Sequence, residues 1–197
     1  MLQRDPVILV AWLVLFAWLV VTASAFWHFE LGNWRSFSEP QAPPTVNAAL
    51  TEEWLRGASD LHSPTASASR LTFVHLYNPN CRCNRFTEPH LARLQRAFAG
   101  RGVRFVAAVS GLGNGPAPLG VETLQADLRM LHTAGIHSAP AALIFDGGGR
   151  LIYYGPYSNS AWCGSLGALV DPVLAHALSG SVQFSGVPAA RGCFCEW

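Results

Sequence analysis

The sequence predicts an α/β domain that follows an N-terminal membrane-spanning helix. Two observations carry this prediction. An uncharged apolar run covers residues 7–27, and from residue 70 onward strand-like and helix-like segments alternate in the order β-α-β-α-β-β-α. Strands that alternate with helices pair in parallel, and a closing hairpin adds an antiparallel edge, so we expect a mixed sheet flanked by helices.

The chain divides into four expected parts. Residues 1–27 form a transmembrane anchor or signal, and residues 28–69 form a linker with a short helix. Residues 70–179 form the α/β domain, and residues 180–197 form a flexible tail that carries cysteines. The prolines at 40, 43 and 44 keep the linker extended.

The apolar run is long enough to cross a bilayer, because a helix rises about 1.5 Å per residue and the hydrocarbon core is about 30 Å thick. Arg4 precedes the run, which favours a cytoplasmic N-terminus and a single-pass protein of the cell membrane with its domain in the periplasm. The alternative is secretion after signal cleavage, since Ala23-Ser24-Ala25 fits a cleavage pattern. Both readings place the cysteines in an oxidising compartment.

Composition excludes one class of partner and several cofactors. The net charge is +1 and no basic run occurs, whereas nucleic-acid binding needs clustered Lys and Arg. The glycine-rich segment 111–116 lacks the dinucleotide pattern, because Pro116 replaces its third glycine, and no phosphate-binding loop lysine is present. We therefore expect no cofactor and no nucleic acid.

Each element follows from local sequence. β-Branched and aromatic residues predict strands, apolar residues at helical spacing predict helices, and Asp146 to Gly149 predicts a hairpin turn. The apolar stripe of Leu124, Leu128 and Leu131 is one such helical pattern. The expected strands are 71–77, 103–109, 141–145 and 151–154, and the expected helices are 46–57, from about 81 to 98, 121–134 and 166–178.

Four of the five cysteines form two C-x-C pairs. Cys81 and Cys83 lie where a strand ends at Asn78-Pro79-Asn80 and a helix begins. Free backbone N–H groups and the positive end of the helix dipole stabilise a thiolate there, and Arg82 adds positive charge. This position favours a reactive pair. The alternative is a structural disulfide or two inert thiols.

From residue 71 to residue 178 the chain resembles the thioredoxin-like superfamily. His75 to Cys81 is similar to the strand and approach to the active-site cysteine, and Pro89 matches the proline that kinks the following helix. Ser138-Ala139-Pro140 and the strand after it resemble the cis-proline loop, and residues 146–155 resemble the closing hairpin.

This resemblance implies roles for single residues. Cys81 would be the attacking cysteine, and Pro140 would lie against it in cis and help to seat a substrate peptide. His75 takes the place of the family's buried acid and would accept a proton, although a core histidine is an equal alternative. The usual second cysteine would fall at Asn84, so Cys83 or Cys163 would resolve the mixed disulfide. The alternative for Cys163 is a structural role as a small buried residue at the start of a helix.

The tail offers a second redox pair. Cys193 and Cys195 follow a segment rich in Gly, Ser and Ala, and a mobile dithiol there could pass electrons to the first pair. The alternative is a disulfide that pins the tail.

Three functions remain open at this stage. The first is a thiol–disulfide oxidoreductase, hence an enzyme, whose partners are protein thiols or disulfides. The second is a thioredoxin-like metallochaperone that binds Cu(I) or Zn(II) through Cys81, Cys83 and His90. The third is a non-catalytic envelope module stabilised by disulfides, against which the odd cysteine count argues.

Overall fold

The computed structural model describes residues 6–28, 34–37, 46–57, 69–110, 120–159, 167–180 and 186–197. Most of the expected linker and Cys163 lie outside these described residues. The chain forms two compact units, Met1–Trp34 and Arg35–Trp197, which are described separately.

The first unit contains helix α1 (Pro6–Phe26), which has no charged residue. Its large apolar side chains are exposed along the whole helix, as expected of a segment that contacts lipid. By length and composition α1 is able to cross a membrane, and a signal sequence would pass the same test. The choice between anchor and cleaved signal therefore stays a prediction.

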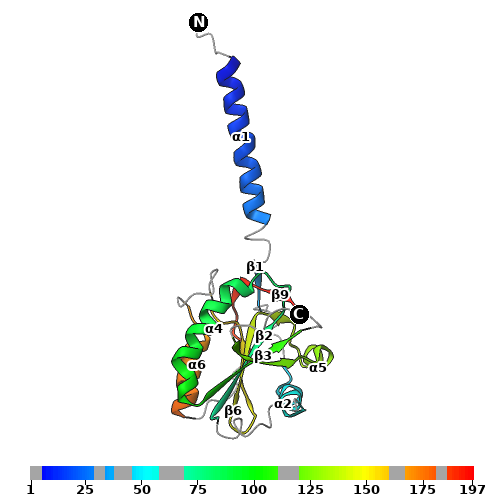
Figure 1. Ribbon diagram of the computed structural model, residues 1–197. Helices are drawn as coiled ribbons and strands as arrows, with labels where there is room; N and C mark the ends of the chain where they lie inside the picture. The colour runs from blue at the N-terminus through cyan, green and yellow to red at the C-terminus, as the bar shows by residue number, and fades with distance from the viewer. Residues whose placement is uncertain are drawn as a thin grey trace. The chain divides into compact units, whose positions relative to one another are not determined.

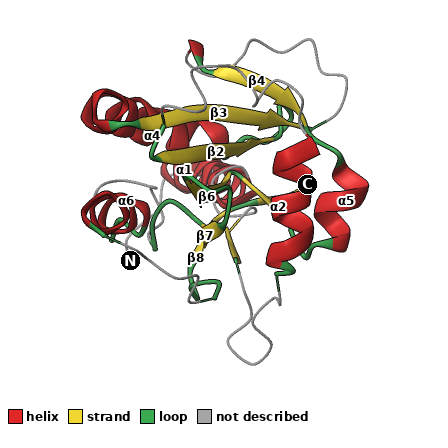
Figure 2. Cartoon of the chain, turned by 90° about the horizontal axis from the view of Figure 1, so that it is seen from below, coloured by secondary structure: helices red, strands yellow, loops and turns green. Residues whose placement is uncertain are grey.

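The second unit is built on a five-stranded mixed sheet (Figure 1). Its strand order is β4-β3-β2-β6-β7, which can be followed in Figure 2. The central strand β2 is parallel to β3 and antiparallel to β6, while β4 is parallel to β3 and β7 is antiparallel to β6. This arrangement confirms the expected mixed sheet and its closing hairpin. The strands are β2 (Leu71–Tyr77), β3 (Val103–Val109), β4 (Glu122–Gln125), β6 (Ala141–Asp146) and β7 (Leu151–Gly155).

Helices cover both faces of this sheet (Figure 2). On one face lie α4 (Asn84–Phe98), which continues into the short turn η3 (Ala99–Arg101), and α6 (Val170–Ser179). On the other lie α2 (Ala48–Gly57) and α5 (Leu128–Thr133). Because side chains alternate along a strand, neighbouring residues of β2 enter different cores. Phe73 packs in the core that contains Leu91 and Leu174, and Val74 packs in the core that contains Trp54 and Leu131.

The expected helix over residues 121–134 is wrong in its first half. Residues 122–125 form β4, which pairs with β3 and buries Leu124. The helix begins only after Asp127, whose carboxylate accepts a hydrogen bond of 3.1 Å from the N–H of Met130. Leu124, Leu128 and Leu131 fit a helical stripe, but pairing at the sheet edge outweighs that spacing. The signal for the true start was the capping residue Asp127.

Residues 186–197 differ from the expected flexible tail. They form β8 (Arg191–Cys193), which pairs with β1 (Trp34–Ser36), and β9 (Cys195–Glu196), which pairs antiparallel with β5 (Ser138–Ala139). Figure 1 shows β9, in red, against the α/β domain. Phe194 and Trp197 belong to the core on the α2 and α5 side. These residues are therefore part of the domain, because they bury apolar side chains and complete two small sheets.

Candidate functional site

Cys81 lies in the short connection between β2 and α4, as the sequence predicted. The side chain of Asn78 turns the chain there: its Oδ1 accepts from the N–H of Asn80 at 3.0 Å, and its Nδ2 donates to the carbonyl of Glu196. The carbonyl of Asn78 accepts from the N–H of Cys81 at 2.9 Å and from the side chain of Asn84 at 2.8 Å. These hydrogen bonds hold Cys81 at the start of α4, buried to 4% exposure.

Two disulfides join the first C-x-C pair to the second. Cys81 forms a disulfide with Cys195, and Cys83 forms a disulfide with Cys193, across sequence separations of 114 and 110 residues. Neither pair is bonded internally. The tail is thus joined to the domain by two long-range disulfides, and a redox role of Cys193 and Cys195 stays a prediction.

The sulfur atoms of the two disulfides lie close together. The sulfur of Cys195 lies 3.9 Å from the sulfur of Cys83, although these two atoms are not bonded. The sulfurs of Cys81, Cys83 and Cys195 all lie within 4.8 Å of one another. Phe86 and Cys195, both partly buried, pack against the other three cysteines. A compact, mostly buried sulfur cluster therefore forms at the start of α4.

The expected cis-proline is confirmed. The Ala139–Pro140 peptide bond is cis, and Pro140 is buried. The carbonyl oxygen of Ala139 lies 3.6 Å from the sulfur of Cys81. The structure therefore brings Cys81 and the cis-proline loop together, as the resemblance implied.

Strand β9 lies along this same loop. Its register places Cys195 opposite Ala139 and Glu196 opposite Ser138. The N–H of Trp197 donates to the carbonyl of His137 at 2.9 Å, and the backbone oxygen of Trp197 contacts Nε2 of His132. Sequence reasoning missed these partners. The available signal was the presence of Phe194 and Trp197 near Cys195, since aromatic side chains are unusual in a mobile tail.

His75 is fully buried on β2, and burial lowers its pKa to about 3. The imidazole is therefore neutral at ordinary pH. Its Nδ1 lies 2.8 Å from the hydroxyl of Tyr157, a partner that the sequence did not reveal. This contact gives one ring nitrogen a partner, and the choice between a core histidine and a proton acceptor stays a prediction.

His90 lies outside the sulfur cluster. Its Nε2 lies 2.7 Å from the carboxylate of Asp171, which also accepts a hydrogen bond of 2.6 Å from Arg93. Burial raises the pKa of the Asp171 carboxyl, but the hydrogen bonds from Arg93 and His90 outweigh it and leave that pKa below its usual value. His90 is thus engaged in tying α4 to α6. Cys163, the other expected partner of Cys81, lies outside the described residues.

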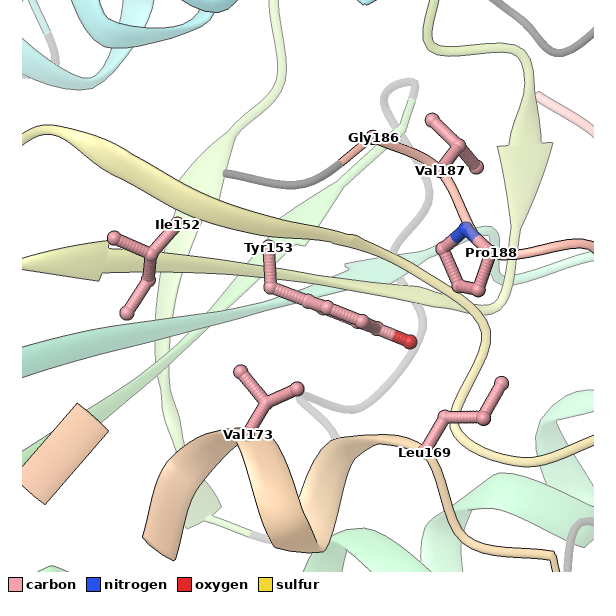
Figure 3. A pocket seen from close by; sticks show the side chains of 7 residues that line it. All are labelled: Ile152, Tyr153, Leu169, Val173, Gly186, Val187 and Pro188. Atoms are coloured by element: carbon pink, nitrogen blue, oxygen red, sulfur yellow. The ribbon is translucent and has the colours of Figure 1, made fainter. Parts of the chain in front are cut away.

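An apolar cavity of about 250 Å³ lies where the tail enters the domain (Figure 3). Residues 186–188 form one wall, and side chains of β7 and of the start of α6 form the others. Beside it, a Cβ atom at Gly155 would come within 2.9 Å of the ring of Pro188. The glycine therefore allows the tail to approach β7 closely.

A known protein family matches the part of the chain that contains these residues. Residues 52–197 match a family described as a domain of unknown function (DUF6436). The chain belongs to this family. The matched region of DUF6436 includes both C-x-C pairs, the cis-proline and the sheet. No curated protein matched the chain.

Several solved structures resemble the chain at low identity. An uncharacterized conserved protein from Geobacillus kaustophilus is 16% identical, with 68% of this chain and 79% of that chain covered and a TM-score of 0.52. A hypothetical protein from Sinorhizobium meliloti is 20% identical over 64% and 80%, with a TM-score of 0.45. The thioredoxin domain of a thiol-disulfide oxidoreductase from Bacteroides vulgatus is 16% identical over 46% and 73%, with a TM-score of 0.39.

The fold of this DUF6436 member is thioredoxin-like, with a mixed sheet flanked by helices and a cis-proline loop beside Cys81. The fold class expected from the sequence is thereby confirmed.

Proposed function

We propose that this chain is a membrane-tethered thiol–disulfide oxidoreductase whose α/β domain works outside the cytoplasm, with Cys81 as the attacking cysteine. Its partners are then protein thiols or disulfides, and α1 is the tether. The observation that carries the proposal is the position of the Cys81 sulfur, which lies at the start of α4 and 3.6 Å from the carbonyl that precedes cis-Pro140.

The chemistry needs Cys81 as a thiolate. The thiolate attacks one sulfur of a substrate disulfide, a mixed disulfide forms, and the other substrate sulfur leaves as a thiolate that takes a proton from water. A second thiol of this chain then attacks the Cys81 sulfur and releases the substrate as a thiol. Cys83 and Cys163 are the resolving cysteines expected from the sequence, and the disulfide to Cys195 adds that residue as a third.

This proposal is tested with the full chain in detergent micelles, equilibrated in glutathione buffers of graded potential. Alkylation and peptide mass spectrometry follow each cysteine. We expect Cys81 to exchange reversibly and to carry glutathione in part of the population. Cys81→Ser should abolish the reduction of an added peptide disulfide by the reduced chain, whereas Cys83→Ser should leave the attack by Cys81 in place. If Cys81 remains blocked or remains free at every potential, the disulfides have a structural role only.

Metal binding is a second candidate, favoured by the three sulfurs within 4.8 Å of one another. Thiolates so spaced suit Cu(I) or tetrahedral Zn(II), whose bonds to sulfur are about 2.3 Å long. Only the reduced protein could bind in this way, because the same sulfurs are bonded in disulfides here. The test is binding of Cu(I) or Zn(II) by the reduced chain. Loss of binding in Cys195→Ser but not in His90→Gln would support a site made of the three sulfurs.

A further inference from the structure

We propose that the two disulfides exchange with each other through Cys195 and Cys83. In the two-electron-reduced protein the remaining disulfide is then Cys83–Cys195, and Cys81 and Cys193 are thiols. This inference rests on the proposed function, because its outcome is a free Cys81 that can attack a substrate.

The geometry supports one route for this exchange. The sulfurs of Cys83 and Cys195 lie 3.9 Å apart, so a short movement brings them to bonding distance. Cys193 is not part of the group of three neighbouring sulfurs. Cys195 is only partly buried, whereas Cys81, Cys83 and Cys193 are buried at 4%, 0% and 6% exposure. Cys195 is thus the sulfur that an external thiol reaches most easily.

The first step consumes an external dithiol, either a protein or a small molecule. One of its thiolates attacks the sulfur of Cys195, the bond between Cys195 and Cys81 breaks, and Cys81 leaves as a thiolate. The second thiol of the reductant then displaces Cys195. The reductant leaves as a disulfide, having supplied two electrons, and Cys195 is left as a thiolate.

The second step is internal and needs no further electrons. The Cys195 thiolate attacks the sulfur of Cys83, and a bond between Cys83 and Cys195 forms as the bond between Cys83 and Cys193 breaks. Cys193 leaves as a thiolate and takes a proton. Two disulfides and one dithiol have become one disulfide within the chain, two thiols within the chain and one oxidised reductant.

This isomerisation frees Cys81 without releasing the tail. Cys195 stays tied to the domain through Cys83, and the backbone contacts of Glu196 and Trp197 with Asn78 and His137 can persist. Cys81 keeps its place beside the Ala139 carbonyl at the start of α4. Cys83 then holds the tail through its disulfide with Cys195, and Cys81 is the thiol that attacks the substrate disulfide.

The sequence allows a direct test. The full chain in micelles receives one equivalent of dithiothreitol, is quenched with acid and alkylated, and is then digested with trypsin and chymotrypsin. Cleavage after Arg82 separates Cys81 from Cys83, and cleavage after Phe194 separates Cys193 from Cys195. Every pairing of these four cysteines therefore gives a distinct linked peptide.

We expect the singly reduced protein to show mainly the peptide pair that links Cys83 to Cys195, with Cys81 and Cys193 alkylated. Retention of Cys83–Cys193 or of Cys81–Cys195 as the main disulfide would overturn the proposal. A link from Cys81 to Cys163 would overturn it too.

A matched pair of variants tests whether Cys83 and Cys195 can form a bond with each other in the folded chain. In Cys193→Ser the thiol of Cys83 is free, so both Cys81–Cys195 and Cys83–Cys195 should be found. In Cys83→Ser only Cys81–Cys195 should remain, with Cys193 free. Absence of Cys83–Cys195 from Cys193→Ser would refute the exchange. If Cys83–Cys195 is absent and the fully reduced chain still accepts glutathione at Cys81, the exchange is refuted while the proposed oxidoreductase function stands.

Discussion

The two C-x-C pairs occupy opposite kinds of position. Cys81 and Cys83 follow a buried central strand and precede a long helix, and short-range hydrogen bonds from Asn78 fix the turn between them. Cys193 and Cys195 lie in a segment whose strands pair only with distant parts of the chain. The first pair is placed by local structure and the second by tertiary contacts. The tail should therefore depend on its disulfides far more than the α4 start does.

The largest expected effect comes from removing the tail cysteines. Cys193→Ser/Cys195→Ser should lower the free energy of unfolding by about 4 kcal/mol or more, because two links that restrict the unfolded chain across more than 100 residues are lost. Urea unfolding followed by tryptophan fluorescence measures this. In excess reductant the variant and the parent should unfold alike, which is the control. A loss below about 1 kcal/mol without reductant would contradict the prediction.

Trp197 should stabilise the protein only while the tail is bound. Trp197→Ala should cost about 3 kcal/mol in the oxidised protein, since the ring is 8% exposed in the core. In the fully reduced protein we expect a cost below about 1 kcal/mol, because the tail can then detach. Leu143→Ala, on the central sheet, is the control and should cost about 3 kcal/mol in both redox states. An equal cost of Trp197→Ala in both states would show that the tail stays docked without disulfides.

His75 should make the stability depend on pH in both redox states, because it belongs to β2 and not to the tail. Its pKa falls from 6.5 to about 3 on folding, so the unfolded chain binds the extra proton between these values and stability falls as the pH drops below about 6.5. Between pH 6.5 and 4.5 the loss through this group should be about 2–3 kcal/mol. His75→Gln should flatten the profile of unfolding free energy against pH, whereas the exposed-site variant His176→Gln should not. An unchanged slope in His75→Gln would refute the assignment.

The smallest expected effect is at Gly155, where the tail approaches β7. A methyl group there would meet the ring of Pro188 at 2.9 Å and the hydroxyl of Tyr153 at 2.7 Å, so Gly155→Ala should cost about 1–2 kcal/mol and speed the alkylation of Cys195 in the reduced protein. Gly100→Ala is the matched control, because a Cβ atom at Gly100 meets nothing within 4 Å. Equal alkylation rates in the two variants would show that this contact does not hold the tail.

Much of the fold could be predicted from the sequence, because most of its strands and helices follow from the residues within each segment. The strand at 103–109 and the end of the helix at Phe98 match the structure, since β-branched runs and apolar periodicity act over a few residues. The placement of Cys81 at a strand-to-helix junction and the cis bond before Pro140 were predicted in the same way, the second through the resemblance. β4 was missed because residues 122–125 form a strand only by pairing with β3, and no local sequence pattern predicts that pairing.

By itself the sequence determined the membrane-length apolar helix, the central sheet and the junction that holds Cys81 and Cys83. Only the tertiary structure decided which cysteines meet, that Tyr157 lies against His75, and that His90 pairs with Asp171 instead of the sulfurs. The physical reason is distance along the chain. A strand or a helix start is stabilised by neighbours within a few residues, whereas the disulfides join residues more than 100 positions apart and depend on how the finished domain folds its last strand back onto the cis-proline loop.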